Sequence, residues 1–282
     1  MKIVVTGAAG LLGKGLVQVF GERHDVSPLT RQEGDITDAQ RMRSLIQEIA
    51  PDVVVHAAGN PDIDACEKNP ELAWKVNSEA TKELASITSQ TGGAFAFVST
   101  DAVFDGKSSR PYVESDVVNP PSVYGKTKVA AEGFVRTHAK HFVFRVSVLF
   151  GPGKANFVNK AWCKAMGNEP YVVANDQLAS ATYTVDAAAT MLQVIEADAF
   201  GTYHVCNHGE CTRYELARRA VELAGLNAGV VVGKPVQEMA RVGPRVKYSV
   251  MKMEALQRRG FQQPRGWEEA LRAYVGTLKP AS

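Results

Sequence analysis

The chain has 282 residues, 45% of them apolar and 22% charged, which is typical of a globular protein with a full core. Its 32 basic and 30 acidic residues give a formal net charge of +2, and no long basic block suggests binding to nucleic acid or to a membrane. The apolar run after Met1 ends at Gly7, and no segment has 18 uninterrupted apolar residues, so we expect neither a signal sequence nor a membrane span. The four cysteines form no CxxC pair, which predicts free thiols and a cytoplasmic location.

The first half of the chain alternates short apolar runs with longer amphipathic stretches. In chain order, the pattern predicts strands at 3–6, 26–29, 53–57, 95–99 and 142–150. Helices are predicted at 10–21, 38–50, 70–91 and 123–137. Because the apolar runs are continuous rather than alternating, the strands should be buried on both faces. This rhythm predicts an α/β fold of the Rossmann type, a doubly wound parallel sheet with helices on both faces.

The pattern loosens after Phe150, where Gly151-Pro152-Gly153 marks a break. Further helices are predicted near 156–166, 185–196 and 212–224 and twice more toward the C-terminus, with strands at 171–174, 203–206 and 230–232. We therefore predict a Rossmann domain at 1–150 and a smaller C-terminal α/β lobe, largely 151–282. Segments near 183–206 are expected to return to the first domain.

A glycine-rich turn joins the first predicted strand to the first helix. Glycines recur every third residue in Gly7-Ala8-Ala9-Gly10-Leu11-Leu12-Gly13. Gly7 would permit a tight turn, Gly10 a close approach of the backbone to a pyrophosphate, and Gly13 close packing of the helix on the sheet. The helix N-terminus would then offer free N–H groups to the phosphates. The motif predicts a dinucleotide site.

The end of the second predicted strand indicates which dinucleotide binds. The acidic residue that would grip an adenosine ribose is missing, and Thr30-Arg31 stands there instead. A guanidinium can pair with a 2′-phosphate through two hydrogen bonds. We therefore favour NADP(H), with NAD(H) as the alternative.

Tyr124 and Lys128 are the strongest chemical signal in the sequence. They are four residues apart on a predicted helix and should share one face. A nearby ammonium lowers the pKa of a phenol and makes it a usable general acid or base. Thr100 ends a predicted strand 24 residues before Tyr124, where open α/β sheets bind ligands. We predict Thr100, Tyr124 and Lys128 as the catalytic residues.

Two further polar residues lie in predicted elements. Asn77 occupies a helix interior, which Asn disfavours, so a functional role is plausible. His56 is on a buried strand without a metal-ligand partner at useful spacing, and it is better explained as a hydrogen-bonded core histidine.

The glycine spacing GxxGxxG, together with Tyr-x3-Lys, resembles the extended short-chain dehydrogenase/reductase family. Within it, the chain is most similar to the dTDP-4-dehydrorhamnose reductase branch. The most specific likeness is the run Ser99-Thr100-Asp101-Ala102-Val103-Phe104-Asp105-Gly106, followed by Tyr124-Gly125-Lys126-Thr127-Lys128 and Glu132. Similar segments extend from the glycine turn to 267–271.

The resemblance implies an enzyme in which NADPH reduces the C4 ketone of a 4-keto-6-deoxy sugar on a nucleoside diphosphate. Tyr124 would donate the proton, Lys128 would hold the cofactor ribose, and Thr100 would polarise the ketone. The expected cofactor contacts are Gly7, Gly10, Leu11, Leu12, Gly13, Thr30, Arg31, Asp35, Ile36, Ala57, Ala58, Gly59, Asn77, Ser99, Tyr124 and Lys128. The expected substrate contacts are Thr100, Asp101, Val103, Phe104, Tyr124, Asn156 and Arg245.

The departures from the family pattern leave alternatives open. Val148 stands where the branch usually carries a Trp that lies against the sugar. Gly15 stands where some relatives place a metal-binding Glu at a dimer contact, so we predict no metal. Relatives often dimerise, which makes a homodimer an open expectation. The alternative functions are a sugar-nucleotide epimerase or dehydratase of the same family, and a non-catalytic NADP-binding regulatory subunit.

Overall fold

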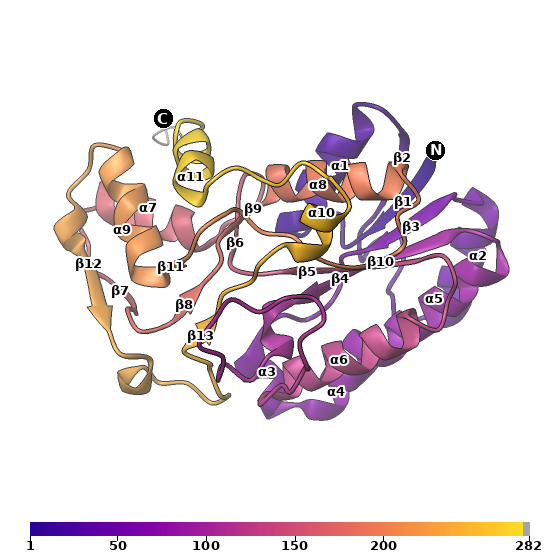
Figure 1. Ribbon diagram of the computed structural model, residues 1–282, viewed down its shortest axis with the longest axis horizontal. Helices are drawn as coiled ribbons and strands as arrows, with labels where there is room; N and C mark the ends of the chain where they lie inside the picture. Colours follow the sequence, from indigo (N-terminus) through magenta and orange to yellow (C-terminus); the bar gives the residue numbers. More distant parts are fainter. Residues whose placement is uncertain (279–282) are drawn as a thin grey trace.

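A parallel sheet of six strands runs through the larger part of the molecule (Figure 1). The structure is a computed structural model that describes residues 1–278. The strands, in spatial order, are β10 (Gly201–His204), β5 (His141–Val146), β4 (Ala94–Thr100), β3 (Val53–His56), β1 (Lys2–Thr6) and β2 (Asp25–Leu29). Because the chain moves outward from β1 in both directions, the strand order reverses there, and ligands of open α/β sheets bind at the carboxyl ends beside such a point.

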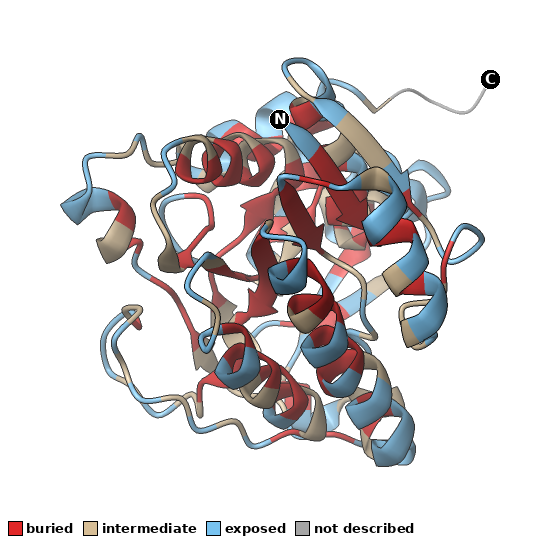
Figure 2. Cartoon of the chain, turned by 90° about the vertical axis from the view of Figure 1, so that its right-hand side faces the viewer, coloured by how far each residue is buried: buried red, intermediate tan, exposed pale blue. Residues whose placement is uncertain are grey.

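Helices cover both faces of this sheet. The strand β1 shows why, because its successive side chains point to opposite faces: Ile3 and Val5 join one core cluster and Val4 joins the other. Figure 2 shows the buried strands between helices whose outer faces are exposed. One face carries α1 (Leu11–Gly21) and α8 (Thr184–Glu196), and the other carries α2 (Ala39–Ile49), α5 (Ala80–Gln90) and α6 (Val123–Val135).

The helix predicted at 70–91 is continuous but contains one wider turn. It comprises α4 (Pro70–Trp74), the π-helical turn η1 (Lys75–Glu79) and α5. The side chain of Asn69 caps α4 by accepting a hydrogen bond from Leu72 N at 3.1 Å. The short helix α3 (Ile63–Lys68), which precedes α4, was not predicted.

The smaller lobe lies at the left of Figure 1 and has cores of its own. It contains three small sheets. Their strands are β7 (Tyr171–Ala174) with β12 (Val231–Lys234), β8 (Leu178–Ala179) with β11 (Cys211–Thr212) and β13 (Tyr248–Ser249), and β6 (Leu149–Phe150) with β9 (Thr182–Tyr183). The helices of the second half outside the large sheet are α7 (Phe157–Met166), α9 (Arg213–Leu223), α10 (Glu254–Arg258) and α11 (Trp267–Val275). Single 3-10 turns form η2 (Asp101–Val103), η3 (Ala228–Val230) and η4 (Val236–Glu238).

The prediction of one strand over 142–150 is wrong. The strand β5 ends at Val146, and β6 leaves the large sheet to pair with β9. Polar contacts of Ser147 accompany the break: its hydroxyl donates to Asp101 Oδ2 at 2.6 Å, and its N–H donates to Thr182 Oγ1 at 3.4 Å. The apolar sequence alone gave no sign of these distant partners.

Two elements of the second half belong to the large sheet and its helical cover. The strand β10 pairs in parallel with β5, and α8 packs on α1. Both fall in the segment near 183–206 that we expect to return to the first domain, and the domain boundary at residue 150 stays a prediction. Within residues 1–278, no helix is long and apolar enough to cross a membrane.

Candidate active site

The glycine turn packs too tightly for side chains. Gly7 has a φ of +72°, and a Cβ there would lie 2.7 Å from Ala58 N. A Cβ on Gly13 would lie 2.1 Å from the carbonyl oxygen of Gly7. The first turn of α1 holds no acidic residue, and no side chain caps it. Its N–H groups are therefore available to an anion, as a dinucleotide pyrophosphate requires.

A cavity of about 720 Å³ opens at the carboxyl ends of β1, β2 and β3. It brings together nine of the predicted cofactor residues: Gly7, Gly10, Thr30, Arg31, Asp35, Ile36, Ala57, Ala58 and Gly59. The other predicted contacts, which are Leu11, Leu12, Gly13, Asn77, Ser99, Tyr124 and Lys128, are not in its wall. Asn60, Lys75 and Lys154 also line the cavity, and no motif in the sequence pointed to them. The cradle, the uncapped helix and the size of the cavity all fit a dinucleotide.

Arg31 lies at the rim of this cavity with its side chain 88% exposed. Its guanidinium pairs with Asp35 at 3.0 Å. Hydrogen bonds from the backbone and hydroxyl of Thr37 lower the pKa of Asp35, and the charge of Arg31 adds to this effect. Arg31 is therefore held after the end of β2 with its guanidinium exposed, and such a group can pair with a phosphate through two hydrogen bonds.

Asn77 links the wall of the cavity to α6, the helix that carries Tyr124 and Lys128. It lies in the π-helical turn η1 and is 2% exposed. Its Oδ1 accepts from Asn60 N at 2.7 Å, and its Nδ2 donates to Asn60 O at 3.1 Å and to Thr127 Oγ1 at 3.3 Å. The wide turn thus orders the wall of the cavity and α6 together, in keeping with the frequent use of π-turns at functional sites.

The start of α6 positions Tyr124, one of the three predicted catalytic residues. Ser122 caps this helix by accepting from Gly125 N at 3.1 Å. Gly125 lets the helix approach η2, because a Cβ there would lie 2.3 Å from Ala102 O. Tyr124 is thereby brought close enough to Thr100 for that hydroxyl to influence the pKa of the phenol. The structure therefore joins the strand-end hydroxyl and the phenol that the sequence only suggested were neighbours.

The phenol of Tyr124 differs from its sequence-based expectation. Burial raises its pKa above the ordinary value, the neighbouring hydroxyl of Thr100 lowers it in part, and the charge of Asp101 raises it further. The expected lowering by Lys128 is therefore wrong for the protein without cofactor. The ammonium of Lys128 instead donates to Val98 O at 2.7 Å and lies 3.9 Å from the ring centre of Phe97. The phenol is thus kept protonated, as a proton donor must be.

The environment of Lys128 is buried and depends on a carboxylate one turn further along α6. Burial lowers the pKa of Lys128 to about 7, and the charge of Glu132 opposes this shift. Burial alone would raise the pKa of Glu132, but Arg145 holds it below its usual value, with Nε 2.9 Å and Nη2 2.8 Å from the carboxylate oxygens. Arg145 lies opposite Ser99 on β5, so the ion pair fixes the helix to the sheet.

Asp101 connects Thr100 to the smaller lobe. Its Oδ1 accepts from Thr100 Oγ1 at 3.1 Å, and its Oδ2 accepts from the hydroxyls of Ser147 and Ser249, both at 2.6 Å. Asp101 also lines a second cleft between the lobes, together with Ser122, Gln177, Arg213, Arg245 and others. Ser122, the cap of α6 two residues before Tyr124, is part of its wall, and Tyr124 itself is not.

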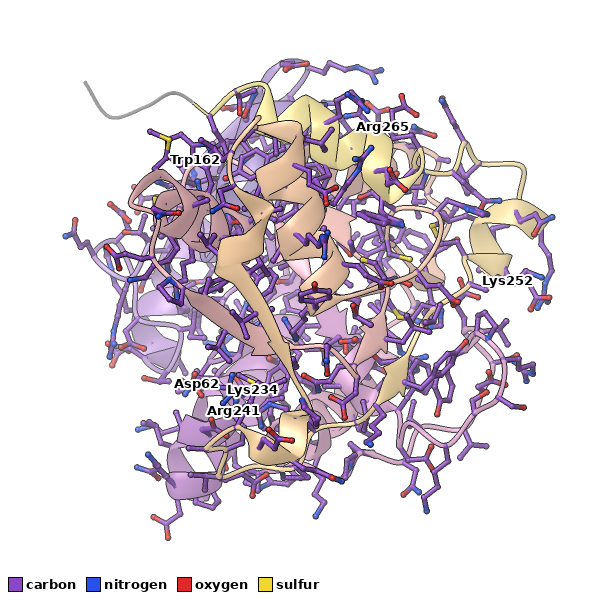
Figure 3. The ribbon with its side chains drawn as sticks, turned by 90° about the vertical axis from the view of Figure 1, so that its left-hand side faces the viewer. Asp62, Trp162, Lys234, Arg241, Lys252 and Arg265 are labelled. Carbon is purple, nitrogen blue, oxygen red and sulfur yellow. The ribbon has the colours of Figure 1, made fainter. Side chains whose placement is uncertain are left out.

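Arginines give the second cleft a positive wall. Burial lowers the pKa of Arg213, and the charge of Asp101 opposes that shift. Arg245 is held by Asp64, with Nη2 and Oδ1 3.0 Å apart, and Arg241 lies 3.7 Å from the other oxygen of Asp64. Figure 3 looks onto this side and labels Arg241 near Asp62, the residue that caps α3. A wall of this charge suits a phosphorylated ligand.

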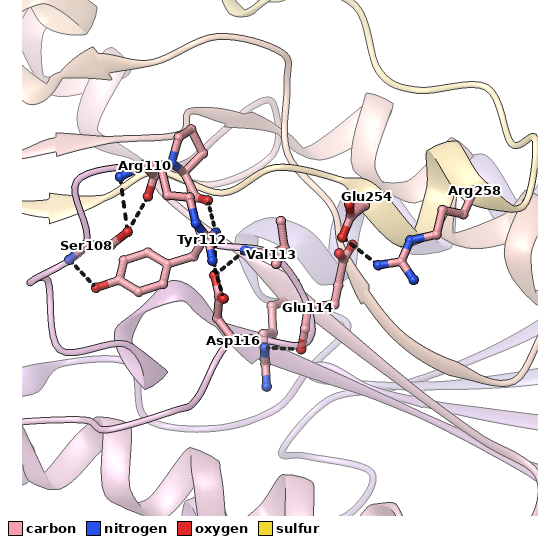
Figure 4. Close-up of polar contacts among 10 residues, drawn as sticks. Ser108, Arg110, Tyr112, Val113, Glu114, Asp116, Glu254 and Arg258 are labelled. Atoms are coloured by element: carbon pink, nitrogen blue, oxygen red, sulfur yellow. Dashed lines mark hydrogen bonds and ion pairs between the residues drawn. The ribbon is translucent and has the colours of Figure 1, made fainter.

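The loop after η2 is held by its own contacts. Figure 4 shows Arg110 facing Asp116, to which its two terminal nitrogens donate at 2.9 and 2.8 Å. Phe104 stacks on Tyr112 with ring centres 4.1 Å apart. Phe104 and Val103 have no exposed surface, so the structure gives both a packing role and brings neither side chain to the cleft.

The remaining predicted residues lie in the interior. Asn156 is 6% exposed and caps α7 instead of facing the cleft. Ser99 is buried, and its hydroxyl has no partner within the described residues. His56 is confirmed as a core histidine, since it has no exposed surface and Nδ1 lies 2.7 Å from Thr6 Oγ1. Burial lowers its pKa to about 3. The four cysteines, Cys66, Cys163, Cys206 and Cys211, are confirmed as free.

The fold and the cavity define a dinucleotide-binding protein of the Rossmann class. A family model described as RmlD substrate binding domain matches residues 1–279. The spore coat polysaccharide biosynthesis protein SpsK of Bacillus subtilis is 34% identical over 276 residues, which is 97% of this chain and 96% of that protein. A dTDP-4-dehydrorhamnose reductase of Streptomyces griseus is also 34% identical, over 95% of this chain and 91% of that one.

A solved structure is similarly close. The dTDP-4-dehydrorhamnose reductase of Bacillus anthracis, in complex with NADP, superposes with a TM-score of 0.94 at 32% identity and covers 98% of this chain and 99% of its own. The chain therefore belongs to the RmlD substrate binding domain family. The predicted resemblance to the dTDP-4-dehydrorhamnose reductase branch is confirmed.

Proposed function

We propose that the protein is an NADPH-dependent reductase of the C4 ketone of a nucleoside-diphosphate 4-keto-6-deoxy sugar. The observation that carries this proposal is that Asp101 and Ser122, the near neighbours of Thr100 and Tyr124 in the chain, line a cleft with two arginines, in a protein whose glycine turn lines a dinucleotide-sized cavity. The named relatives support the same chemistry, because the Streptomyces protein is a dTDP-4-dehydrorhamnose reductase and the Bacillus structure holds NADP.

Each residue then has a distinct role. NADPH, when bound, supplies the hydride that C4 gains. Thr100 and Tyr124 direct hydroxyl groups at the ketone oxygen, and Tyr124 gives that oxygen its proton as the carbonyl becomes an alcohol. The resulting tyrosinate takes its next proton from solvent. Lys128, released from Val98 O, binds the cofactor ribose and stabilises the tyrosinate by its charge.

Specific residues are proposed to select cofactor and substrate. Arg31, from the adenosine end of the cavity, pairs with the 2′-phosphate and favours NADPH over NADH. Arg245, held by Asp64, contacts the diphosphate or sugar in the second cleft. Val148, where relatives usually place a Trp, leaves the identity of the sugar open.

Two other functions are weighed against reduction. An epimerase or dehydratase of this class returns the hydride to the sugar, and the branch-specific run around Thr100 favours reduction instead. A non-catalytic NADP-binding subunit would not need the buried ion pair that supports Lys128. Turnover of a 4-keto sugar nucleotide at the expense of NADPH therefore separates both alternatives from the reductase.

The decisive test is the Tyr124→Phe variant. We expect the wild-type protein to consume NADPH with dTDP-4-dehydrorhamnose, measured by the absorbance of the reduced nicotinamide. Tyr124→Phe should lower kcat at least about a hundredfold, because the proton donor is lost. The control, Tyr214→Phe on α9, should keep wild-type activity. Equal turnover by the two variants, or none by the wild type with any 4-keto sugar nucleotide, contradicts the proposal.

Location and assembly complete the proposal. We propose a cytoplasmic location, supported by the four free cysteines.

We also propose a homodimer. Trp74 and Phe134, 39% and 36% exposed on the contacting helices α4 and α6, offer apolar surface for such a contact. Light scattering during gel filtration measures the oligomeric state, and a monomer at all concentrations would contradict the proposed homodimer.

A further inference from the structure

The loop between β6 and α7 carries a lysine to the cofactor cavity. Lys154 is in the wall of that cavity, although its loop belongs to the second half of the chain. The second cleft does not include it. Within residues 1–278, its ammonium forms no salt bridge with a carboxylate, whereas Arg31 on the same wall is already paired with Asp35. Lys154 is thus an available charge at the dinucleotide site.

The loop that holds Lys154 is fixed at both ends. The side chain of Asn156 donates to Gly151 O at 2.7 Å and to Lys154 O at 3.1 Å, and it also contacts the phenol of Tyr274 at 3.0 Å. Asn156 is 6% exposed, so these bonds are shielded from water. The position of the Lys154 backbone is therefore fixed by buried hydrogen bonds from Asn156.

The other side of the loop rests on α1. The ammonium of Lys14, in the first turn of that helix, donates to Gly153 O. Gly153 has a φ of +94°, and a Cβ there would lie 2.6 Å from the Lys14 side chain. The residue next to Gly153 is therefore held near the N-terminus of α1, where the free N–H groups face the pyrophosphate site. The 2′-phosphate site is proposed at a different element of the same cavity, at Thr30 and Arg31 after β2.

From this geometry we propose that Lys154 binds the pyrophosphate of the dinucleotide, so that a loop from the second half of the chain contributes to the cofactor site beside the N-terminus of α1. The inference rests on the proposed function, since it assumes a dinucleotide in the cavity. The ammonium would complete a site that the helix N-terminus begins, adding a mobile charge to fixed backbone donors. Asn156 then serves as a positioning residue for this contact.

The test compares two cofactors that share the pyrophosphate and differ in the 2′-phosphate. Dissociation constants for NADPH and NADH are measured by calorimetry at low salt. Lys154→Ala should weaken both by a similar factor, about tenfold, because one charge-assisted hydrogen bond is lost. Arg31→Ala should weaken NADPH selectively. Higher salt should reduce the difference between Lys154→Ala and wild type, since the contact is at the surface.

The controls separate the possible outcomes. Lys160→Ala, which removes the same charge from the exposed side of α7, should bind both cofactors as the wild type does. Asn156→Ala should weaken NADPH and NADH together, as Lys154→Ala does, and add little when combined with it. Unchanged binding by Lys154→Ala overturns the proposal, as does a loss confined to NADPH, which would place the lysine at the 2′-phosphate. A wild-type protein that binds neither cofactor refutes the proposed function itself.

Discussion

The surroundings of Lys128 show how the protein stabilises a single buried ammonium. Its side chain is 5% exposed, so the ammonium is destabilised relative to water, and burial lowers its pKa to about 7. The carbonyl of Val98, the ring of Phe97 and the charge of Glu132 offset part of that cost. In the protein without cofactor, the ammonium of Lys128 is therefore destabilised by burial. A ribose hydroxyl and a developing tyrosinate would stabilise it.

At this residue, stability should depend on pH with a definite sign. The folded pKa of Lys128 lies below the unfolded value of about 10.4, so the unfolded chain binds more protons between them, and stability rises with pH in that window. Lys128→Met removes the titration. Its gain in free energy of unfolding over wild type, on the order of a few kcal/mol near pH 7, should shrink toward pH 10. Urea denaturation across this range measures it, and a pH-independent difference would contradict the pKa.

At the scale of elements, the site depends on how closely α6 packs against η2. Two glycines of this one helix have opposite surroundings. A Cβ on Gly125 would lie 2.3 Å from Ala102 O and 2.5 Å from the Pro120 side chain, whereas nothing lies within 4 Å of a Cβ on Gly133. The first glycine is a requirement of packing, and the second only lowers helix propensity.

This contrast gives a matched pair of variants. Gly125→Ala should lower the free energy of unfolding by about 1–3 kcal/mol, because α6 and η2 must move apart to make room for the new methyl group. It should also reduce kcat, because this movement takes Tyr124 on α6 away from Thr100. Gly133→Ala on the same helix should be neutral or more stable by up to about 1 kcal/mol, with activity unchanged. Thermal melts and steady-state rates report both. Equal effects of the two substitutions would show that the close approach is unimportant.

At the scale of the molecule, polar contacts beside the second cleft join α3 and the end of β4 to the second half of the chain. Asp64 in α3 holds Arg245 and Arg241, and Asp101 after β4 holds Ser249. These contacts place the arginine wall relative to Tyr124. They are therefore expected to influence substrate binding more than cofactor binding.

Asp64→Asn tests this division. The amide oxygen can still accept from the backbone of Gly243, but the charge that holds Arg245 is lost. We expect KM for the sugar nucleotide to rise about tenfold and the dissociation constant for NADPH to stay unchanged, because an ion pair at the cleft is broken and the cofactor cavity is not. In a double-mutant cycle with Arg245→Gln, the two effects should be less than additive. Additive losses, or weaker NADPH binding, would contradict the role of this pair.

The sequence by itself determined the large sheet and its helices, and it supplied Thr100, Tyr124 and Lys128 as the proposed catalytic residues. These follow from local rules: apolar runs buried on both faces, a glycine turn that only glycine can form, and Tyr124 four residues from Lys128 on one helix. The same rules identified His56 as a core residue. They also supported the family assignment, because its motifs are contiguous stretches such as Ser99–Gly106.

Only the tertiary structure decided which distant groups meet. It ended β5 at Val146, where Ser147 bonds to Asp101, and it raised the pKa of Tyr124 through burial of the phenol and the charge of Asp101. It also placed the Asn156 side chain where it bonds to the backbone of Lys154, and it brought Lys154 to the cofactor cavity. Hydrogen bonds between residues far apart in the chain, and the desolvation of charges among them, depend on packing in three dimensions, which periodicity and spacing do not encode.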